Sequence, residues 1–197
     1  MPALDLEPAT KRLSALVTGV ADAQLGDPTP CEGTPVAALL DHLNSFAVGF
    51  AIAARKDFEA MGGRPPAASA DNLMPDWRTA LPARLDELAE AWRAPEAWTG
   101  MTKAGSIDLP GEVCGVVALD ELVLHGWDLA KATGQPFDVE PDHLEAVHGF
   151  VTTFEVPADA PADANRLFGP PVPVPDDAPL LDRTLGRAGR DPGWSPA

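Results

Sequence analysis

The sequence predicts an all-α protein, an up-and-down four-helix bundle with an additional helix and a Pro-rich C-terminal tail. Apolar residues recur at helical spacing in several stretches, and segments rich in Gly and Pro separate those stretches. The chain has 197 residues, enough for one domain with a sizeable core. We therefore divide it into a helical bundle over residues 1–156 and a Pro-rich extension over residues 157–197 that packs on the bundle.

The first two helices are predicted on either side of a loop. Apolar residues recur every three or four positions over residues 6–20, which predicts the first helix. Residues 26–33 are rich in Gly and Pro and predict a loop. Thr34 and Pro35 then open a second helix, because Thr is a good N-cap and Pro suits the first turn. This helix carries the clearest apolar stripe and should end before the breaker cluster at residues 62–66.

Three further helices complete the predicted bundle. Residues 76–93 place leucines and tryptophans on one face, although Pro82 indicates that this helix starts or kinks there. Residues 94–110 lack a clear period and predict either a loop or a short hairpin. Residues 112–132 are apolar on nearly every side, which predicts a helix buried over most of its surface. A fifth helix is expected after Pro141.

The C-terminal part of the chain changes composition. Residues 157–179 are rich in proline and predict extended polyproline II structure. A last helical turn is expected over residues 180–185, and Trp194 is expected to pack back onto the bundle.

The charge of the chain argues against two classes of partner. The formal net charge is −16 and the sequence pI is about 4.4, so the surface repels phosphate backbones and anionic lipid headgroups. We expect no nucleic-acid partner and no membrane partner. The first residues show no basic and apolar leader pattern, and we expect a cytoplasmic protein. Cys31 and Cys114 are too few for a disulfide scaffold. The sequence leaves a single Cys31–Cys114 bridge open, but a reducing compartment disfavours it, and we interpret both as small buried apolar side chains.

The fourth helix carries the residues that indicate chemistry. Glu121 and His125 are four positions apart and lie on one face, together with Asp128 and, two turns away, Cys114. An ionised carboxylate among apolar residues costs several kcal/mol unless it is paired or bound to a metal. A divalent ion accounts for this pair, because Glu supplies an anionic oxygen and His a neutral nitrogen.

A third ligand must come from another helix, and His42 is the candidate. It lies at the edge of the apolar stripe of the second helix, flanked by small residues that allow another helix to approach. A set of His42, Glu121 and His125 leaves the fourth position open, which is typical of catalytic zinc sites. The other interpretation is that Glu121 and His125 only bond to each other. His143 and His148 are not spaced as a pair, and we interpret them as surface or core-edge residues.

Two segments resemble signatures of the DinB-like superfamily. Residues 29–43 contain TPCEG and LLDHL, and residues 121–134 read ELVLHGWDLAKATG. More narrowly, these segments resemble the N-terminal domain of mycothiol-dependent maleylpyruvate isomerases. Residues 168–175 and 189–194 also resemble the single-domain, actinobacterial members of that group. The full isomerases have a second, C-terminal domain that adds catalytic residues, where this chain has a short Pro-rich tail.

The resemblance implies a four-helix bundle whose metal, usually zinc, is held by His42, Glu121 and His125. Nickel or iron would suit the same nitrogen and oxygen donors. The resemblance also implies a low-molecular-weight thiol, such as mycothiol, as cosubstrate. We hypothesise that the metal lowers the pKa of this thiol, which then reacts with a small electrophile as a transferase or isomerase would.

Asp128 would orient one of the ligands in this hypothesis, and Cys114 would line the cavity. A non-catalytic protein that binds a metal or a small ligand is the alternative. A bundle whose polar residues are only structural, such as a homodimer, is the third interpretation.

Overall fold

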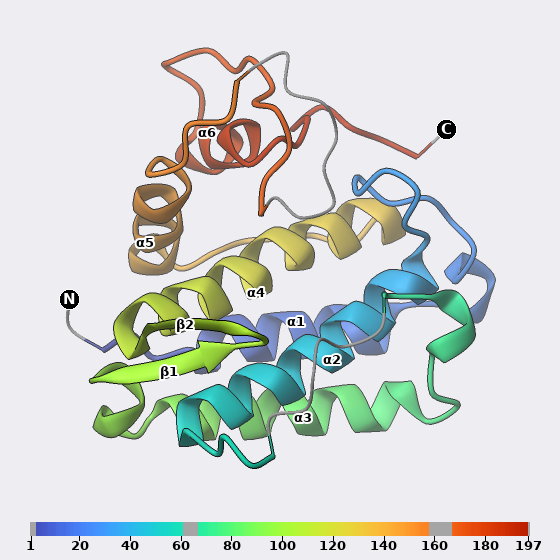
Figure 1. The fold of residues 1–197 in the computed structure, drawn as a ribbon. Helices are drawn as coiled ribbons and strands as arrows, with labels where there is room; N and C mark the ends of the chain where they lie inside the picture. The colour runs from blue at the N-terminus through green and yellow to red at the C-terminus, as the bar shows by residue number, and fades with distance from the viewer. Residues whose placement is uncertain (1–2, 61–66, 158–166, 197) are drawn as a thin grey trace.

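Helices dominate the computed structural model, which describes residues 3–60, 67–157 and 167–196 (Figure 1). The α-helices of this part of the chain are α1 (Glu7–Gly19), α2 (Val36–Arg55), α3 (Trp77–Trp92), α4 (Gly111–Thr133), α5 (Pro141–Val151) and α6 (Leu180–Arg187). Short 3-10 turns occupy Asp22–Gln24, Ala70–Asn72 and Pro95–Trp98. The predicted helical class is therefore confirmed, with one small hairpin added to it.

The first four helices pack around a shared core in an order that differs from their order in the chain. Helix α1 contacts α3 and α4, and α2 contacts the same two helices. Helices α1 and α2 therefore lie diagonally across from each other (Figure 1). The loop between α1 and α2 crosses the end of the bundle, so neighbours in the sequence are not neighbours in space here. This arrangement sets α2 directly against α4.

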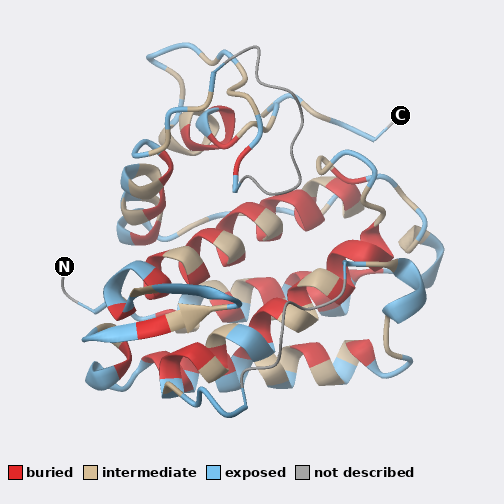
Figure 2. Ribbon diagram, viewed as in Figure 1, coloured by how far each residue is buried: buried red, intermediate tan, exposed pale blue. Residues whose placement is uncertain are grey.

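The hydrophobic core lies between these helices, where their apolar faces meet. Figure 2 shows buried residues along most of α4, which is covered by the other bundle helices and by the C-terminal segment. Fully buried leucines of four helices meet here, among them Leu13, Leu40, Leu85 and Leu119. Because the apolar stripes converge at these positions, burial of the stripes is the main force that holds the bundle together.

A two-stranded antiparallel hairpin precedes α4. Strand β1 (Met101–Ala104) pairs with β2 (Ile107–Pro110), and the turn between them uses Gly105 at a φ of 59°. The Thr102 hydroxyl donates a 2.6 Å hydrogen bond to the Ala53 carbonyl of α2, which ties the hairpin to the bundle. The sequence left a loop and a hairpin open for this segment, and the hairpin is the one that forms.

The ends of the bundle helices follow their local sequence signals. Helix α2 ends at Arg55, before residues 62–66 as predicted, and Lys56 follows in the left-handed region with a φ of 54°. The breaker cluster at 62–66 lies outside the described residues. Helix α3 begins at Trp77 and continues through Pro82. Helix α4 stops at Gly134, which adopts a φ of 68° as a C-terminal glycine does.

Helix α2 is the one described helix that is long and apolar enough to cross a membrane by length and composition. Most of its residues are buried against the other helices. Core helices of soluble proteins have the same properties, so this feature matches its place in the bundle.

The C-terminal segment lies against α4 and α5. Residues 170–175 form neither helix nor strand, and the predicted polyproline segment lies partly outside the described residues because 158–166 are not described. Helix α6 is longer than the single turn predicted for it and packs on α5. Trp194 is partly buried and packs against the core cluster, which includes residues of the bundle and of the C-terminal segment.

Candidate metal centre

Three side chains predicted as metal ligands meet where α2 packs against α4. His42 lies on α2, whereas Glu121 and His125 lie one turn apart on α4. His42 Nε2 is 3.0 Å from Glu121 Oε2, and His125 Nε2 is 3.2 Å from the same oxygen. The two imidazole rings meet edge to face, with their centroids 4.7 Å apart. The fold thus brings all three residues together from two helices.

The geometry of these donors fits a divalent ion. One donor atom from each of the three residues lies within 4.8 Å of the other two. Two ligands of a tetrahedral zinc ion stand about 3.4 Å apart, given bonds of about 2.1 Å. The His42–Glu121 and His125–Glu121 separations of 3.0 and 3.2 Å are close to that value. The side chain of His42 is 37% exposed, so the set opens toward solvent on one side.

The charge of Glu121 depends on its two imidazole neighbours. Burial raises the pKa of this carboxyl, but hydrogen bonds from His125 and His42 outweigh burial and hold the pKa well below its usual range. Glu121 is therefore an anion at neutral pH. An anionic oxygen between two nitrogens is the arrangement that can receive a cation.

The second ring nitrogen of His125 faces Asp128. His125 Nδ1 is 2.9 Å from Asp128 Oδ2, and the Asp128 side chain is fully buried. Burial lowers the pKa of His125, but hydrogen bonds to Asp128, Cys31 and Glu121 raise it well above 6.5. When Nδ1 carries the proton that Asp128 accepts, Nε2 is the nitrogen that can bind a metal. Asp128 therefore contacts the ring of His125, and its role in orienting a metal ligand stays a prediction.

Two residues beside Asp128 were not predicted to belong to the site. The Cys31 thiol donates to Asp128 Oδ2 at 3.1 Å, so the interpretation of Cys31 as a mere buried apolar side chain is wrong. Arg190, beyond α6, donates to Asp128 Oδ1 from Nε at 3.2 Å and to Oδ2 from Nη2 at 3.0 Å. The sequence contained one indirect signal for Arg190. Asp128 lies on a helix predicted to be mostly buried, and a buried carboxylate needs a cationic partner, which another segment must supply.

A second acidic group, Asp120, precedes Glu121 on α4 and is held mainly in its neutral form. Asp120 is 6% exposed, and its Oδ1 has no hydrogen-bond partner among the described residues. Burial, and then the negative charge of Glu121, raise the pKa of Asp120 to about 8. At neutral pH, Asp120 therefore adds little negative charge to the site.

A cavity of about 580 Å³ adjoins His42 and Glu121. Most of its walls come from α2, and the hairpin, α3 and α4 complete them. The walls are mainly apolar and include the phenyl rings of Phe46 and Phe50 and the cationic side chain of Arg84. Arg84 also donates to the Asn44 side chain. This volume lies in the range of about 300–1,000 Å³ that is common for small-molecule pockets.

Other candidate residues lie apart from this site. Cys114 is fully buried, is a free thiol and does not line the large cavity, and burial raises its pKa to about 12. His148 is half-buried, with Nδ1 3.0 Å from Thr184 Oγ1. His143 is buried rather than at the core edge, and its Nε2 donates to the Asp5 carbonyl at 2.8 Å.

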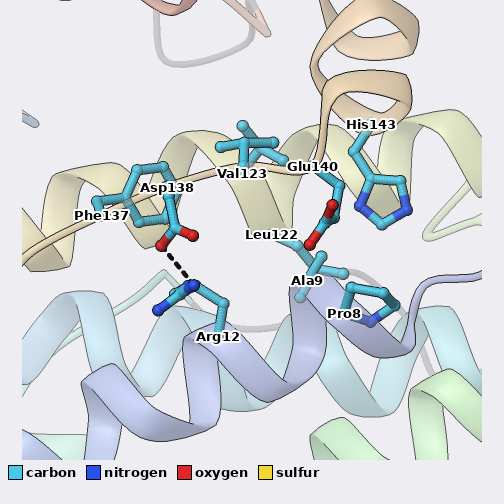
Figure 3. A pocket seen from close by; sticks show the side chains of 10 residues that line it. Pro8, Ala9, Arg12, Leu122, Val123, Phe137, Asp138, Glu140 and His143 are labelled. Atoms are coloured by element: carbon cyan, nitrogen blue, oxygen red, sulfur yellow. Dashed lines mark ion pairs between the residues drawn. The ribbon is translucent and has the colours of Figure 1, made fainter.

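A small cavity lies beside His143, between α1, α4 and the segment that leads into α5 (Figure 3). Its volume is about 30 Å³, and the Arg12–Asp138 ion pair lies at one side of it. This space has room for one or two water molecules and is too small for a substrate.

Known proteins are similar to this chain in sequence or in fold. Two uncharacterised proteins from Mycobacterium tuberculosis, strains CDC 1551 and H37Rv, are each 26% identical over 196 residues, covering 96% of this chain and 97% of the relative. The crystal structure of the mycothiol-dependent maleylpyruvate isomerase has a TM-score of 0.59 at 19% identity. That match covers 74% of this chain and 66% of the isomerase. A histidine-to-alanine mutant of the isomerase gives a TM-score of 0.58 at 17% identity over the same shares.

The family assignment rests on the part of the chain that contains the bundle. A family model described as the mycothiol maleylpyruvate isomerase N-terminal domain matches residues 6–130, which include His42, Glu121 and His125. This match confirms the resemblance noted in the sequence. The chain belongs to the family of mycothiol maleylpyruvate isomerase N-terminal domains.

Proposed function

We propose that this protein binds one divalent metal ion, zinc in the first instance, through His42, Glu121 and His125. The observation that carries the proposal is the convergence of three donor atoms within 4.8 Å at the edge of a 580 Å³ cavity. The family assignment supports the proposal, since the matched residues include all three donors.

We further propose that the protein is a thiol-dependent transferase or isomerase. A small thiol of the mycothiol type would react with a small electrophile, and the reaction would either join the two molecules or isomerise the electrophile. A bound divalent ion would supply a Lewis acid that lowers the pKa of the thiol. The chain's own residues would do the rest: the two histidines and Glu121 hold the ion, and Asp128 fixes the ring of His125 through Nδ1. The proposed thiol dependence is inferred from the mycothiol maleylpyruvate isomerase family and from the similar fold of the mycothiol-dependent maleylpyruvate isomerase.

The cavity beside the ligands supports a small organic substrate. Phe46 and Phe50 present apolar surface to a carbon skeleton, and Arg84 offers a cation to a negatively charged group. The ring of His42 is the ligand side chain most open to this cavity. A substrate in the cavity would therefore meet the open side of the ligand set.

Metal analysis tests the first part of the proposal. Purified protein should contain about one metal ion per chain by mass spectrometry, and His125→Ala should lose it. His148→Ala is the matched control, because His148 contacts Thr184 away from the ligand set, and this variant should keep the metal. If wild type has no stoichiometric metal and does not take up added Zn²⁺, the polar residues of the bundle are only structural.

A thiol panel tests the second part. Mycothiol, bacillithiol and glutathione would each be mixed with the metal-loaded protein and with maleylpyruvate or 1-chloro-2,4-dinitrobenzene as electrophile. Loss of thiol or of maleylpyruvate that requires both the metal and His125 supports an enzyme. Tight metal binding with no turnover across this panel would favour the alternative, a non-catalytic binding protein.

A further inference from the structure

His125 belongs to two sets of potential metal ligands at once. Its Nε2 faces His42 and Glu121, whereas its Nδ1 faces Cys31 and Asp128. The second set also has all its donor atoms within 4.8 Å of one another, and Asp128 within it is fully buried. A thiolate, an imidazole and a carboxylate are good ligands for zinc and for similar ions. By donor chemistry alone, an ion could bind on either side of the same ring.

A side chain already supplies positive charge to the second set. The Arg190 guanidinium, 11% exposed, makes a two-pronged contact with Asp128, and its Nη2 lies 3.9 Å from Cys31 Sγ. Arginine stays protonated in proteins, so this charge is permanent. A divalent ion between Cys31 and Asp128 would lie against that charge and would have to displace the guanidinium from its carboxylate.

The backbone fixes Arg190 at this place. Its N–H donates to the Leu185 carbonyl at 2.9 Å at the end of α6, and its Nη1 donates to the Ala188 carbonyl. Gly189, with a φ of 79°, lies so close to Gly169 that an added Cβ would be 2.9 Å from the Gly169 backbone. The side chain therefore enters the bundle from a well-packed turn.

Arg190 lies outside the family match, which ends at residue 130. We infer that Arg190 excludes metal ions from the Cys31–His125–Asp128 set and so directs the ion to the Nε2 side of His125. Asp128, neutralised by Arg190, accepts the Nδ1 proton of His125, and this leaves the lone pair of Nε2 for the His42–Glu121 side. In this role Arg190 is a positioning and selectivity residue. The inference rests on the proposed metal site.

Cobalt spectroscopy of the full chain tests the inference without any activity assay. Co²⁺ takes the same nitrogen, oxygen and sulfur ligands, and a thiolate ligand adds a near-ultraviolet charge-transfer band. Wild type should bind Co²⁺ without that band, and Cys31→Ser should have the same spectrum and affinity. Arg190→Gln should gain the band, and Cys31→Ser in that background should remove it. Chelator competition should also show affinity lowered about 10- to 100-fold in Arg190→Gln, since the support of His125 is weakened.

Two further variants separate selectivity from simple anchoring of the tail. Arg187→Gln is the matched control: Arg187 is exposed on α6 and donates to the Phe154 carbonyl, so its loss should leave the cobalt spectrum unchanged. Arg190→Lys keeps the charge but not the two-pronged contact, so it should show no thiolate band and an intermediate affinity. This variant and the Cys31→Ser comparison in wild type keep the test decisive if Arg190→Gln does not fold.

The outcomes distinguish the inference from the proposed function. A thiolate band in wild type overturns the inference, because the ion would then use Cys31 despite Arg190. An unchanged spectrum and affinity in folded Arg190→Gln also overturn it, because Arg190 would then only anchor the tail. If wild type takes up no Co²⁺ at all, the proposed metal site itself fails.

Discussion

Replacing Asp128 by Asn tests whether its ion pair with Arg190 stabilises the fold. Asp128 is fully buried, and the Arg190 side chain is 11% exposed. The carboxylate accepts hydrogen bonds from Arg190, from His125 Nδ1 and from the Cys31 thiol. Asn keeps the shape but removes the charge, and one of its two side-chain ends becomes a donor that faces other donors.

The expected loss of stability is large for a single substitution. Removing one partner of a buried ion pair costs about 3–5 kcal/mol, because the other charge stays buried without compensation. We place Asp128→Asn at about 3 kcal/mol, the lower end, since Arg190 still donates to the Ala188 carbonyl. A domain of this kind is stable by about 5–15 kcal/mol, so the variant should still fold.

The same pair should make stability depend on pH in a defined direction. Burial raises the pKa of Asp128, but Arg190 and His125 outweigh burial and hold it well below its usual range. A carboxyl whose folded pKa lies below its unfolded pKa stabilises the fold above the unfolded value of about 3.9. That contribution is lost as the pH falls through the folded pKa. The stability difference between wild type and Asp128→Asn should therefore shrink in acid below about pH 4.

Urea unfolding of EDTA-treated protein, followed by tryptophan fluorescence at pH 7, measures the effect. A double-mutant cycle with Arg190→Gln should give a coupling of about 1.5 kcal/mol or more, because the double variant has no isolated buried charge. Asp138→Asn is the control: Asp138 forms an exposed pair with Arg12, so its loss should change stability by less than about 0.5 kcal/mol. The reasoning is refuted if Asp128→Asn costs less than about 1 kcal/mol or if the two substitutions simply add.

Three other measurements probe different parts of the molecule. Burial raises the pKa of Cys114 to about 12, so Ellman's reagent at pH 8 should react with only Cys31 in the folded protein and with both thiols in urea. Rapid reaction of both thiols in the folded protein would contradict this. Although burial lowers the pKa of His125, its hydrogen bonds raise it well above 6.5, so a bound ion must displace a proton. The affinity for Co²⁺ should then rise about tenfold per pH unit from pH 6 to 7, and calorimetry in two buffers should detect the released proton. An affinity for Co²⁺ that does not change with pH would argue against His125 as a ligand. A Cβ on Gly115 would lie 2.4 Å from a tryptophan ring, so Gly115→Ala should lower the free energy of unfolding by about 1–3 kcal/mol. Gly49 has open space around it, so Gly49→Ala should raise the free energy of unfolding by up to about 1 kcal/mol. Equal melting temperatures of the two variants would contradict this packing.

The sequence predicts the parts of this site that depend on helical spacing. Glu121 and His125 could be paired from the sequence because residues four apart on a helix share a face. His42 required the packing of α2 against α4, and its choice rested on the small residues around it and on the resemblance. The same local reasoning predicted the stop of α4 at Gly134, because a glycine after an apolar helix adopts the left-handed backbone that ends it.

Contacts between distant segments could not be predicted in this way. Cys31 meets Asp128 across 97 positions and Arg190 meets it across 62, and no periodic pattern relates such residues. The spatial order of the helices in the bundle does not follow from local patterns for a similar reason. Short loops suggest that successive helices are neighbours, but the apolar faces of α1 and α2 are both covered by α3 and α4.

The charges around His125 indicate what kind of ligand the proposed metal site would favour. Asp128 and Arg190 neutralise each other, and Asp120, with a pKa raised to about 8, is mainly uncharged at neutral pH. Among the described residues, Glu121 is then the remaining anion in contact with the two histidines of the proposed site. A divalent ion with one carboxylate and two neutral imidazoles has a net charge of about +1. This excess charge lies in a protein whose formal net charge is −16, so an anionic ligand such as a thiolate would be repelled by the surface and held at the centre. Affinity for an anionic thiol should therefore depend on the ion far more than affinity for a neutral one.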